Sequence, residues 1–83
     1  MTHFFADMPI VVTADALGTP QAFVWAGRRE RVAHILERWL IDVGWRERRI
    51  WREYFALITR SGLLVVIMRD VVRGRWYLER LYD

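Results

Sequence analysis

Apolar and polar positions alternate in short runs along most of the chain, and turns that contain glycine separate these runs. The run from Leu63 to Asp70 is short and rich in β-branched residues, which is typical of a strand buried on both faces. The aromatic and β-branched residues 50–59 predict a strand before it, and residues 75–83 predict one after it. Three strands at near-regular spacing, with turns between them, indicate an antiparallel meander.

The first part of the chain has a weaker strand pattern. We expect residues 1–8 to form a lead-in that is loosely held or packed as an edge, and residues 10–14 to form a short strand. Phe23 and Trp25 are two positions apart in the next expected strand, so their side chains share one face. Both are predicted to contribute to the core. Gly27 follows them and favours a hairpin turn, because glycine readily adopts a positive φ.

Residues 31–43 fit two structures. As a helix they would place one apolar stripe on one face, at Val32, Ile35, Leu36, Trp39, Leu40 and Val43. As a strand their alternation is poorer, but the hairpin expected before them favours a long, bent strand with a bulge. The predicted fold is therefore mainly β: a small antiparallel meander that forms a strongly bent sheet or a small barrel, with residues 9–83 as a single domain. The alternative is an α+β fold with one helix at about 31–43.

Composition narrows the class of protein. The chain has 83 residues, enough for one domain, and 54% of them are hydrophobic. It contains no cysteine, which excludes disulfides, thiol chemistry and a Cys-ligated zinc site. Its longest apolar run is far shorter than the roughly 20 residues that cross a bilayer, and no secretory signal is recognisable. We expect a cytoplasmic protein without a membrane partner.

The charged residues are unevenly distributed by type. All 13 basic residues are arginine, against 10 acidic residues, which gives a net charge of +3. This small excess permits attraction to nucleic acid or to acidic partners without requiring it. Most of the charges can pair with one another, so the basic balance alone does not identify a ligand.

Residues suited to catalysis are scarce. The histidines are His3 and His34, the one serine is Ser61, and no phosphate-binding glycine loop or metal-ligand spacing is present. A nucleophile beside a base cannot be assembled from this set, and His34, within "VAHIL", is expected to be a half-buried packing residue. We therefore predict a protein that is not an enzyme and has no catalytic, cofactor-binding or metal-binding residues.

Several carboxylates lie next to arginine in the sequence. Neighbouring residues of a strand point to opposite faces, so their charges would pair across strands. We expect salt-bridge ladders that orient the strands, formed by Arg52, Glu53, Arg69, Asp70, Glu79 and Arg80. Asp83 is expected to pair with an arginine and to hold the end of the chain in place.

The five tryptophans fall into two groups. Trp39 and Trp76 lie in strongly apolar surroundings and are predicted to be core residues. The other three lie close to arginines, and rings interleaved with guanidinium groups suit single-stranded nucleic acid, because bases stack on the rings while arginines bind phosphates. The candidate nucleic-acid-binding residues are Trp25, Arg28, Arg29, Trp45, Arg46, Arg48, Arg49 and Trp51. The alternative is that arginines cover these rings as intramolecular cation–π pairs, and the sequence does not place the two arginine groups relative to each other.

One set of motifs resembles a known family. The order "F-x-W-x-G-R", "V-x-x-I-L-x-x-W", "R-E-Y" and a terminal "R-D-x-x-x-G-x-W-Y-L-x-R-x-Y-D" covers roughly residues 20–83. It resembles a family of small uncharacterised bacterial proteins, known only as a domain of unknown function, whose members often lie near or are fused to polymerase-like proteins of the mutagenic DNA-repair cassette. The matching positions are Phe23, Trp25, Gly27, Arg28, Val32, Ile35, Leu36, Trp39, Arg52, Glu53, Tyr54, Arg69, Asp70, Gly74, Trp76, Tyr77, Leu78, Arg80, Tyr82 and Asp83. The resemblance implies a small, mainly β domain, supports the strand at residues 31–43 and implies a link to DNA repair, but it transfers no activity.

Two functions remain in view. The first is an accessory binding module for single-stranded nucleic acid, linked to DNA repair. The second is a protein-interaction or self-association module, which uses an apolar sheet face or an open strand edge to bind a repair protein or to form a homodimer. The high apolar fraction for so short a chain favours the second function.

Overall fold

The computed structural model consists of six strands and one short 3-10 helix. It describes residues 1–82, except for the side chains of Asp7 and Arg46. The elements are β1 (Thr2–Ala14), β2 (Pro20–Trp25), β3 (Arg28–Val43), η1 (Arg46–Arg48), β4 (Ile50–Thr59), β5 (Leu64–Asp70) and β6 (Arg75–Tyr82). The prediction of a mainly β fold is confirmed. The expected ion pair of Asp83 lies outside the described residues.

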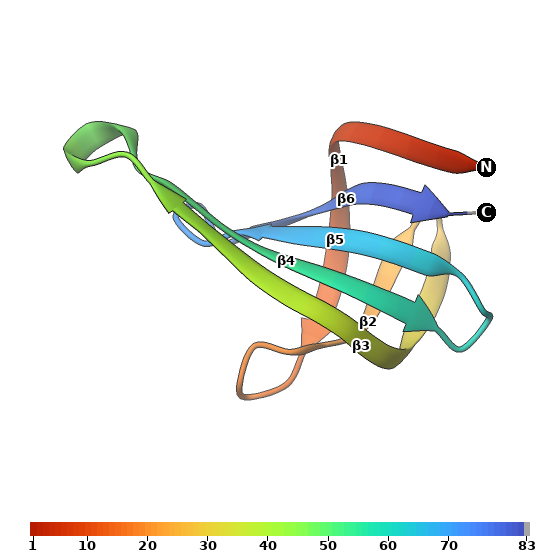
Figure 1. The fold of residues 1–83 in the computed structure, drawn as a ribbon. Coiled ribbons are helices and arrows are strands. Elements are labelled where there is room, and N and C mark those ends of the chain that lie inside the picture. Colours follow the sequence, from red (N-terminus) through yellow and green to blue (C-terminus); the bar gives the residue numbers. More distant parts are fainter. Residues whose placement is uncertain (83) are drawn as a thin grey trace.

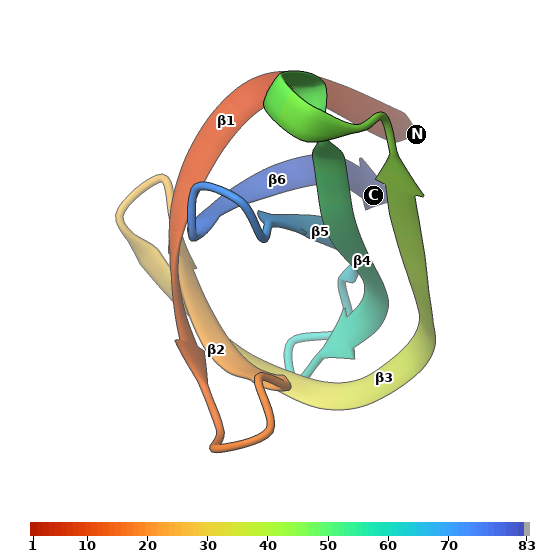
Figure 2. The same ribbon diagram turned by 90° about the vertical axis from the view of Figure 1, so that its left-hand side faces the viewer.

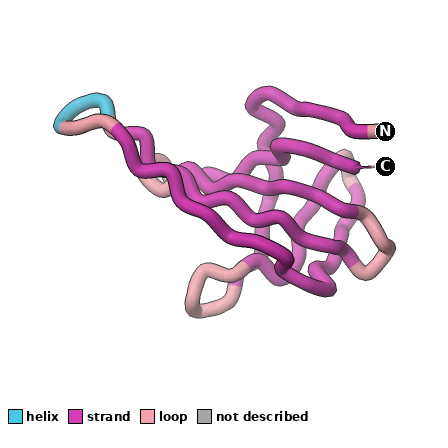
Figure 3. Tube along the Cα trace, viewed as in Figure 1, coloured by secondary structure: helices cyan, strands magenta, loops and turns pink. Residues whose placement is uncertain are grey.

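The strands form a closed antiparallel barrel in chain order, β1 to β6 (Figures 1 and 3). Figure 2 looks into the barrel and shows the strands surrounding one interior. β1 closes it, because its first part pairs with β6, where Thr2 lies opposite Tyr82, and its last part pairs with β2, where Val12 lies opposite Phe23. A register shift between Phe4 and Met8 bends β1 within its pairing with β6, and the pairing with β2 begins beyond it at Val11.

The start of the chain corrects two expectations. Residues 1–8 were expected to be a lead-in that is loosely held or packed as an edge, and the first strand to begin near Ile10. Instead β1 begins at Thr2 and pairs with β6 on both sides of its bend. Phe5, at the bend, packs against the core and meets Trp25 edge-on, with ring centroids 5.9 Å apart. Tertiary packing therefore orders a segment whose local pattern is weak.

The barrel interior holds the main core. Its buried members are Ile10, Phe23, Phe55, Leu57, Val65, Ile67, Leu78 and Leu81. Phe23 and Trp25 share this face as predicted, with Trp25 half-buried at the edge of the cluster. The turn between β2 and β3 uses Ala26 and Gly27 at φ 50° and 72°, the pair of positive values that a two-residue type I′ hairpin requires.

β3 settles the ambiguity of residues 31–43, where the helical alternative is wrong. The segment is a strand paired with β4, and its register shifts between Val32 and His34 and again between Ile35 and Glu37. These bulges produce the long, bent strand that was the preferred prediction. Leu36, which lies within the second shift, is largely exposed, and His34 is exposed on β3 rather than half-buried as expected.

A second apolar cluster covers the outer face of the sheet. Tyr54, Val66 and Met68 are buried there, although they lie outside the barrel interior. Trp39 stacks on Tyr54 with centroids 5.2 Å apart and rings nearly parallel. Trp39 was predicted to be a core residue, and the structure places it, half-buried, in this outer cluster. β5 is therefore buried on both faces, as its sequence predicts.

One of the expected salt-bridge ladders is present. Glu53 on β4 is buried, and its carboxylate binds Arg38 of β3 and Arg69 of β5, the latter at 3.2 Å. Glu53 and Arg69 lie directly opposite each other. Asp70 pairs instead with Arg73 in the following turn, at 3.2 Å. Among the described residues Arg52, Glu79 and Arg80 form no ion pair, so the ladder is shorter than predicted.

Candidate functional site

The hairpin of β3 and β4 extends beyond the rest of the barrel. We call residues 41–52 the arm: here Ile41, Asp42 and Val43 pair only with Arg52, Trp51 and Ile50, and η1 caps the tip. Figure 1 shows the arm projecting away from the barrel body.

A tight turn holds the arm tip. Gly44 has φ +89°, and a Cβ added there would lie 2.1 Å from the carbonyl oxygen of Arg48. The chain reverses so closely at this point that a side chain at residue 44 would clash with backbone. A hydrogen bond from the Arg48 amide to the Trp45 carbonyl, at 3.3 Å, completes the turn.

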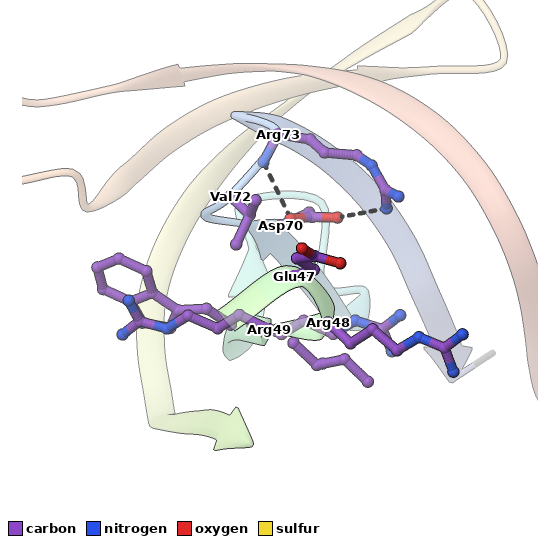
Figure 4. A pocket seen from close by; sticks show the side chains of 9 residues that line it. Glu47, Arg48, Arg49, Asp70, Val72 and Arg73 are labelled. Carbon is purple, nitrogen blue, oxygen red and sulfur yellow. Dashed lines mark hydrogen bonds and ion pairs between the residues drawn. The ribbon is translucent and has the colours of Figure 1, made fainter. Parts of the chain in front are cut away.

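A cavity of about 340 Å³ lies between the arm and the turn from β5 to β6. Its lining comes from Glu47, Arg48, Arg49, Ile50, Trp51, Arg52, Asp70, Val72 and Arg73. Figure 4 shows these side chains, with Arg48 and Arg49 extending in opposite directions from the tip. The two chain segments are joined by a hydrogen bond from the Val71 amide to the Trp51 carbonyl, at 2.9 Å.

Two of the four arginines at this cavity are held by carboxylates. Arg49 forms two hydrogen bonds to Asp42, at 3.0 and 2.8 Å, and its guanidinium lies 4.4 Å from the ring centroid of Trp51. The hydrogen bonds from Arg49 lower the pKa of Asp42 below its usual value. Arg73 binds Asp70. The Arg49–Trp51 contact is the intramolecular cation–π pair that was the alternative to ligand binding.

The other two arginines are available to a ligand. Among the residues that the structure describes, neither Arg48 nor Arg52 takes part in an ion pair. Arg48 is exposed and Arg52 half-buried. Guanidinium groups that form no ion pair with the described residues, beside apolar side chains such as Ile50 and Val72, suit an anionic ligand that also has an apolar surface.

The predicted site residues do not gather in one place. Trp25, Arg28 and Arg29 lie at the turn from β2 to β3, and the arm tip lies at the opposite end of β3 (Figure 1). Trp25 packs against Phe5, and Arg28 lies 3.6 Å from Glu30. The first arginine group therefore does not contribute to the cavity at the arm.

The second predicted group is at the arm tip. Arg48, Arg49 and Trp51 line the cavity. Trp45, which precedes them in the sequence, is 79% exposed. The side chain of Arg46 lies outside the described residues. The structure thus brings three of the eight predicted residues together at the cavity.

Arg52 and Arg73 line the cavity but were not among the candidate binding residues. Arg52 was assigned to a salt-bridge ladder, and Arg73 lies in a turn that was given no role. The sequence did contain a signal for Arg73, because successive turns of a meander alternate between its two ends. The turn at Arg73 is two strands beyond the turn at Arg48, and it therefore lies at the same end.

Other sites of the described chain offer less chemistry. A cavity of about 460 Å³ lies where β1 crosses the start of β6, and its lining is mainly apolar with Arg75 as its charged member. No group of three or more His, Asp or Glu residues among those described is arranged to hold a metal ion. No helix in the same part of the chain is long and apolar enough to cross a membrane.

Comparison with protein-family models, with curated proteins and with solved structures finds no match to this chain. The fold and the site therefore define the class: a small closed antiparallel β-barrel with a projecting basic hairpin arm.

Proposed function

We propose that the protein is a non-catalytic binding module, and that its ligand is single-stranded nucleic acid bound at the arm tip. The observation that carries this proposal is the pair Arg48 and Arg52, which line the cavity without a carboxylate partner among the described residues. Phosphates of a flexible strand can reach both guanidinium groups. The exposed ring of Trp45 supplies a surface on which a base can stack.

The proposal uses part of the originally expected residue set. Trp25, Arg28 and Arg29 are left out because they lie at the other end of the barrel. Arg49 acts indirectly in this scheme, since Asp42 and Trp51 already hold its guanidinium. The resemblance to proteins near the mutagenic repair cassette supports DNA as the strand in question.

The test is a fluorescence-anisotropy titration of a labelled oligothymidine at two salt concentrations. Binding is expected to weaken as salt rises, with a slope of roughly 0.7 per phosphate contact on a single strand. In the double variant Arg48→Gln/Arg52→Gln we expect at least tenfold weaker binding and a salt slope smaller by about 1.4. Trp45→Ala removes the stacking ring and is expected to weaken binding by about 5-fold or more.

A matched control exists at the other end of the barrel. The double variant Arg28→Gln/Arg29→Gln removes the same charge from two exposed arginines and is expected to leave binding at the arm nearly intact. Equal losses in the two double variants would show that only net charge matters and would contradict the site. Absence of binding at low salt would contradict the function.

A second candidate function is protein interaction. The observation that favours it is the exposure of large apolar side chains on and next to the arm, where Leu40 and Val43 are 55% and 53% exposed. Exposed apolar groups that lie together are typical of interaction surfaces. Light scattering over a concentration series tests whether the partner is a second copy.

A further inference from the structure

The outer edge of β3 is open over most of its length. β2 pairs with β3 only from Arg28 to Arg31. From Val32 to Val43 no other strand of the described chain lies along this edge, and β4 occupies the opposite edge alone. Figures 1 and 2 show this side of β3 uncovered by other segments.

The distal half of this edge is regular. Both register shifts of β3 lie before Glu37, and from Glu37 to Val43 every residue pairs one-to-one with β4. A regular free edge presents alternate backbone N–H and C=O groups without partners, which is a template for another strand. Bulges, prolines and lysines usually protect such an edge, and this segment contains none of them.

The side chains along the segment are self-complementary. Consider a second copy in antiparallel orientation, with Leu40 of one chain opposite Leu40 of the other. Arg38, which binds Glu53 in its own chain, then lies opposite Asp42 of the second copy, which binds Arg49 in that chain, so two ion pairs of opposite order meet on each side of the axis. On the other face of the sheet Trp39 lies opposite Ile41. Opposite charges and apolar pairs are the cross-strand combinations that stabilise a sheet.

Other registers lose this match. A shift by one residue would place the residues of one face of β3 opposite those of the other face of β3 in the second copy. A shift by two residues in either direction places Leu40 opposite Arg38 or opposite Asp42, and the charged pair is lost. A twofold interface requires a surface that complements itself, and the register centred on Leu40 meets this requirement.

We propose that the protein forms a symmetric dimer in which the free edges of two β3 strands pair antiparallel about Leu40. The sheets of the two barrels become continuous through this pairing. Val43 of each copy lies opposite Glu37 of the other, so each arm lies along the barrel of its partner. The inference identifies the partner of the second candidate function and does not depend on nucleic-acid binding.

Analytical ultracentrifugation over a concentration series tests the dimer. The monomer has a mass of 10.0 kDa, so the wild type is expected to approach twice that mass. Leu40→Lys places two like charges opposite each other at the twofold axis, and we expect the dissociation constant of the dimer to rise at least tenfold. Leu17→Lys makes the same change at an exposed residue in the loop between β1 and β2, outside β3, and is expected to leave the dimer unchanged.

Cross-linking tests the register. The chain contains no cysteine, so any disulfide reports an introduced residue. Leu40→Cys should cross-link rapidly under mild oxidation, because directly opposite positions bring Cβ atoms near disulfide range. Ile41→Cys should cross-link much more slowly, because in this register residue 41 faces residue 39 of the partner. Equal rates for the two variants would overturn the register.

The two proposals fail separately. A wild-type protein that stays monomeric at every concentration, or a dimer indifferent to Leu40→Lys, would overturn the dimer. Neither result alters the oligonucleotide titration of the arm-tip variants. Leu40→Lys is expected to fold normally, since residue 40 is largely exposed and lies opposite Glu53 on β4; thermal unfolding of the variant verifies this.

Discussion

Glu53 offers a sharp test of how the sheet is held together. Its side chain is 5% exposed and binds two arginines from the flanking strands, Arg38 through Oε2 and Arg69 through Oε1. Glu53→Gln keeps the shape of the side chain but removes its charge. The Gln amide has one oxygen, which replaces the carboxylate oxygen for one of the two guanidinium groups. Its NH2 group then faces the second guanidinium, which is also a hydrogen-bond donor.

The cost of this change can be worked from the exposure of the two arginines. Breaking a buried ion pair by removing one partner costs about 3 to 5 kcal/mol. The side chains of Arg38 and Arg69 are 57% and 33% exposed, so water can replace part of what the carboxylate supplied. We therefore expect a loss of about 2 kcal/mol in the free energy of unfolding. For a domain of this size that loss lowers Tm by about 8 to 16 °C.

Urea unfolding followed by tryptophan fluorescence measures the loss. Glu37→Gln is the matched control, because Glu37 is an exposed glutamate on β3 and forms no ion pair among the described residues. It is expected to change stability by less than about 0.5 kcal/mol. If Glu53→Gln were no more destabilising than Glu37→Gln, the reasoning about the buried carboxylate would be refuted.

Two further predictions concern the core and the arm. Leu57→Ala truncates a fully buried side chain of the barrel interior and is expected to cost about 2 to 5 kcal/mol in a urea titration, whereas the exposed Leu36→Ala should cost less than about 0.5 kcal/mol; equal effects would contradict the assignment of the interior. At the arm, Arg49 lowers the pKa of Asp42, so the Asp42 carboxylate favours the folded arm at neutral pH and loses that effect as pH falls through its folded-state pKa. A carboxyl NMR titration should show that pKa rising toward its ordinary value in Arg49→Gln, and an unchanged titration would show that the hydrogen bonds do not form in solution.

The second half of the fold could be predicted from the sequence because its signals are local. The strand at Ile50–Thr59 and the doubly buried run that becomes β5 have apolar residues at the spacing that the sheet requires. β3 was ambiguous because its apolar residues serve different surfaces. Ile35 packs on the core, Trp39 lies in the outer cluster, and Leu40 is exposed. Such a strand has no single apolar face, and its residues can mimic a helical stripe.

The parts that escaped prediction depend on long-range pairing. β1 is ordered from Thr2 by β6, which lies at the other end of the sequence, and no local pattern reports that contact. The separation of the two arginine groups follows from topology: they occupy the turns at either end of one strand, β3. Once residues 31–43 are taken as a strand, the separation could have been deduced, but it could not while a helix remained an alternative.

The ladder between Thr2 and Tyr82 has a consequence for how the barrel assembles. The barrel closes only when β1 pairs with β6, and these strands lie far apart in the sequence. The conformational entropy of the long loop between them is therefore lost in this one step. Folding should be slow for a protein of this size and strongly cooperative. Because the same ladder leaves Thr2 opposite Tyr82, a short linker could join these two residues, and the β4–β5 turn at Gly62 would then be a natural place for new ends in a circular permutant.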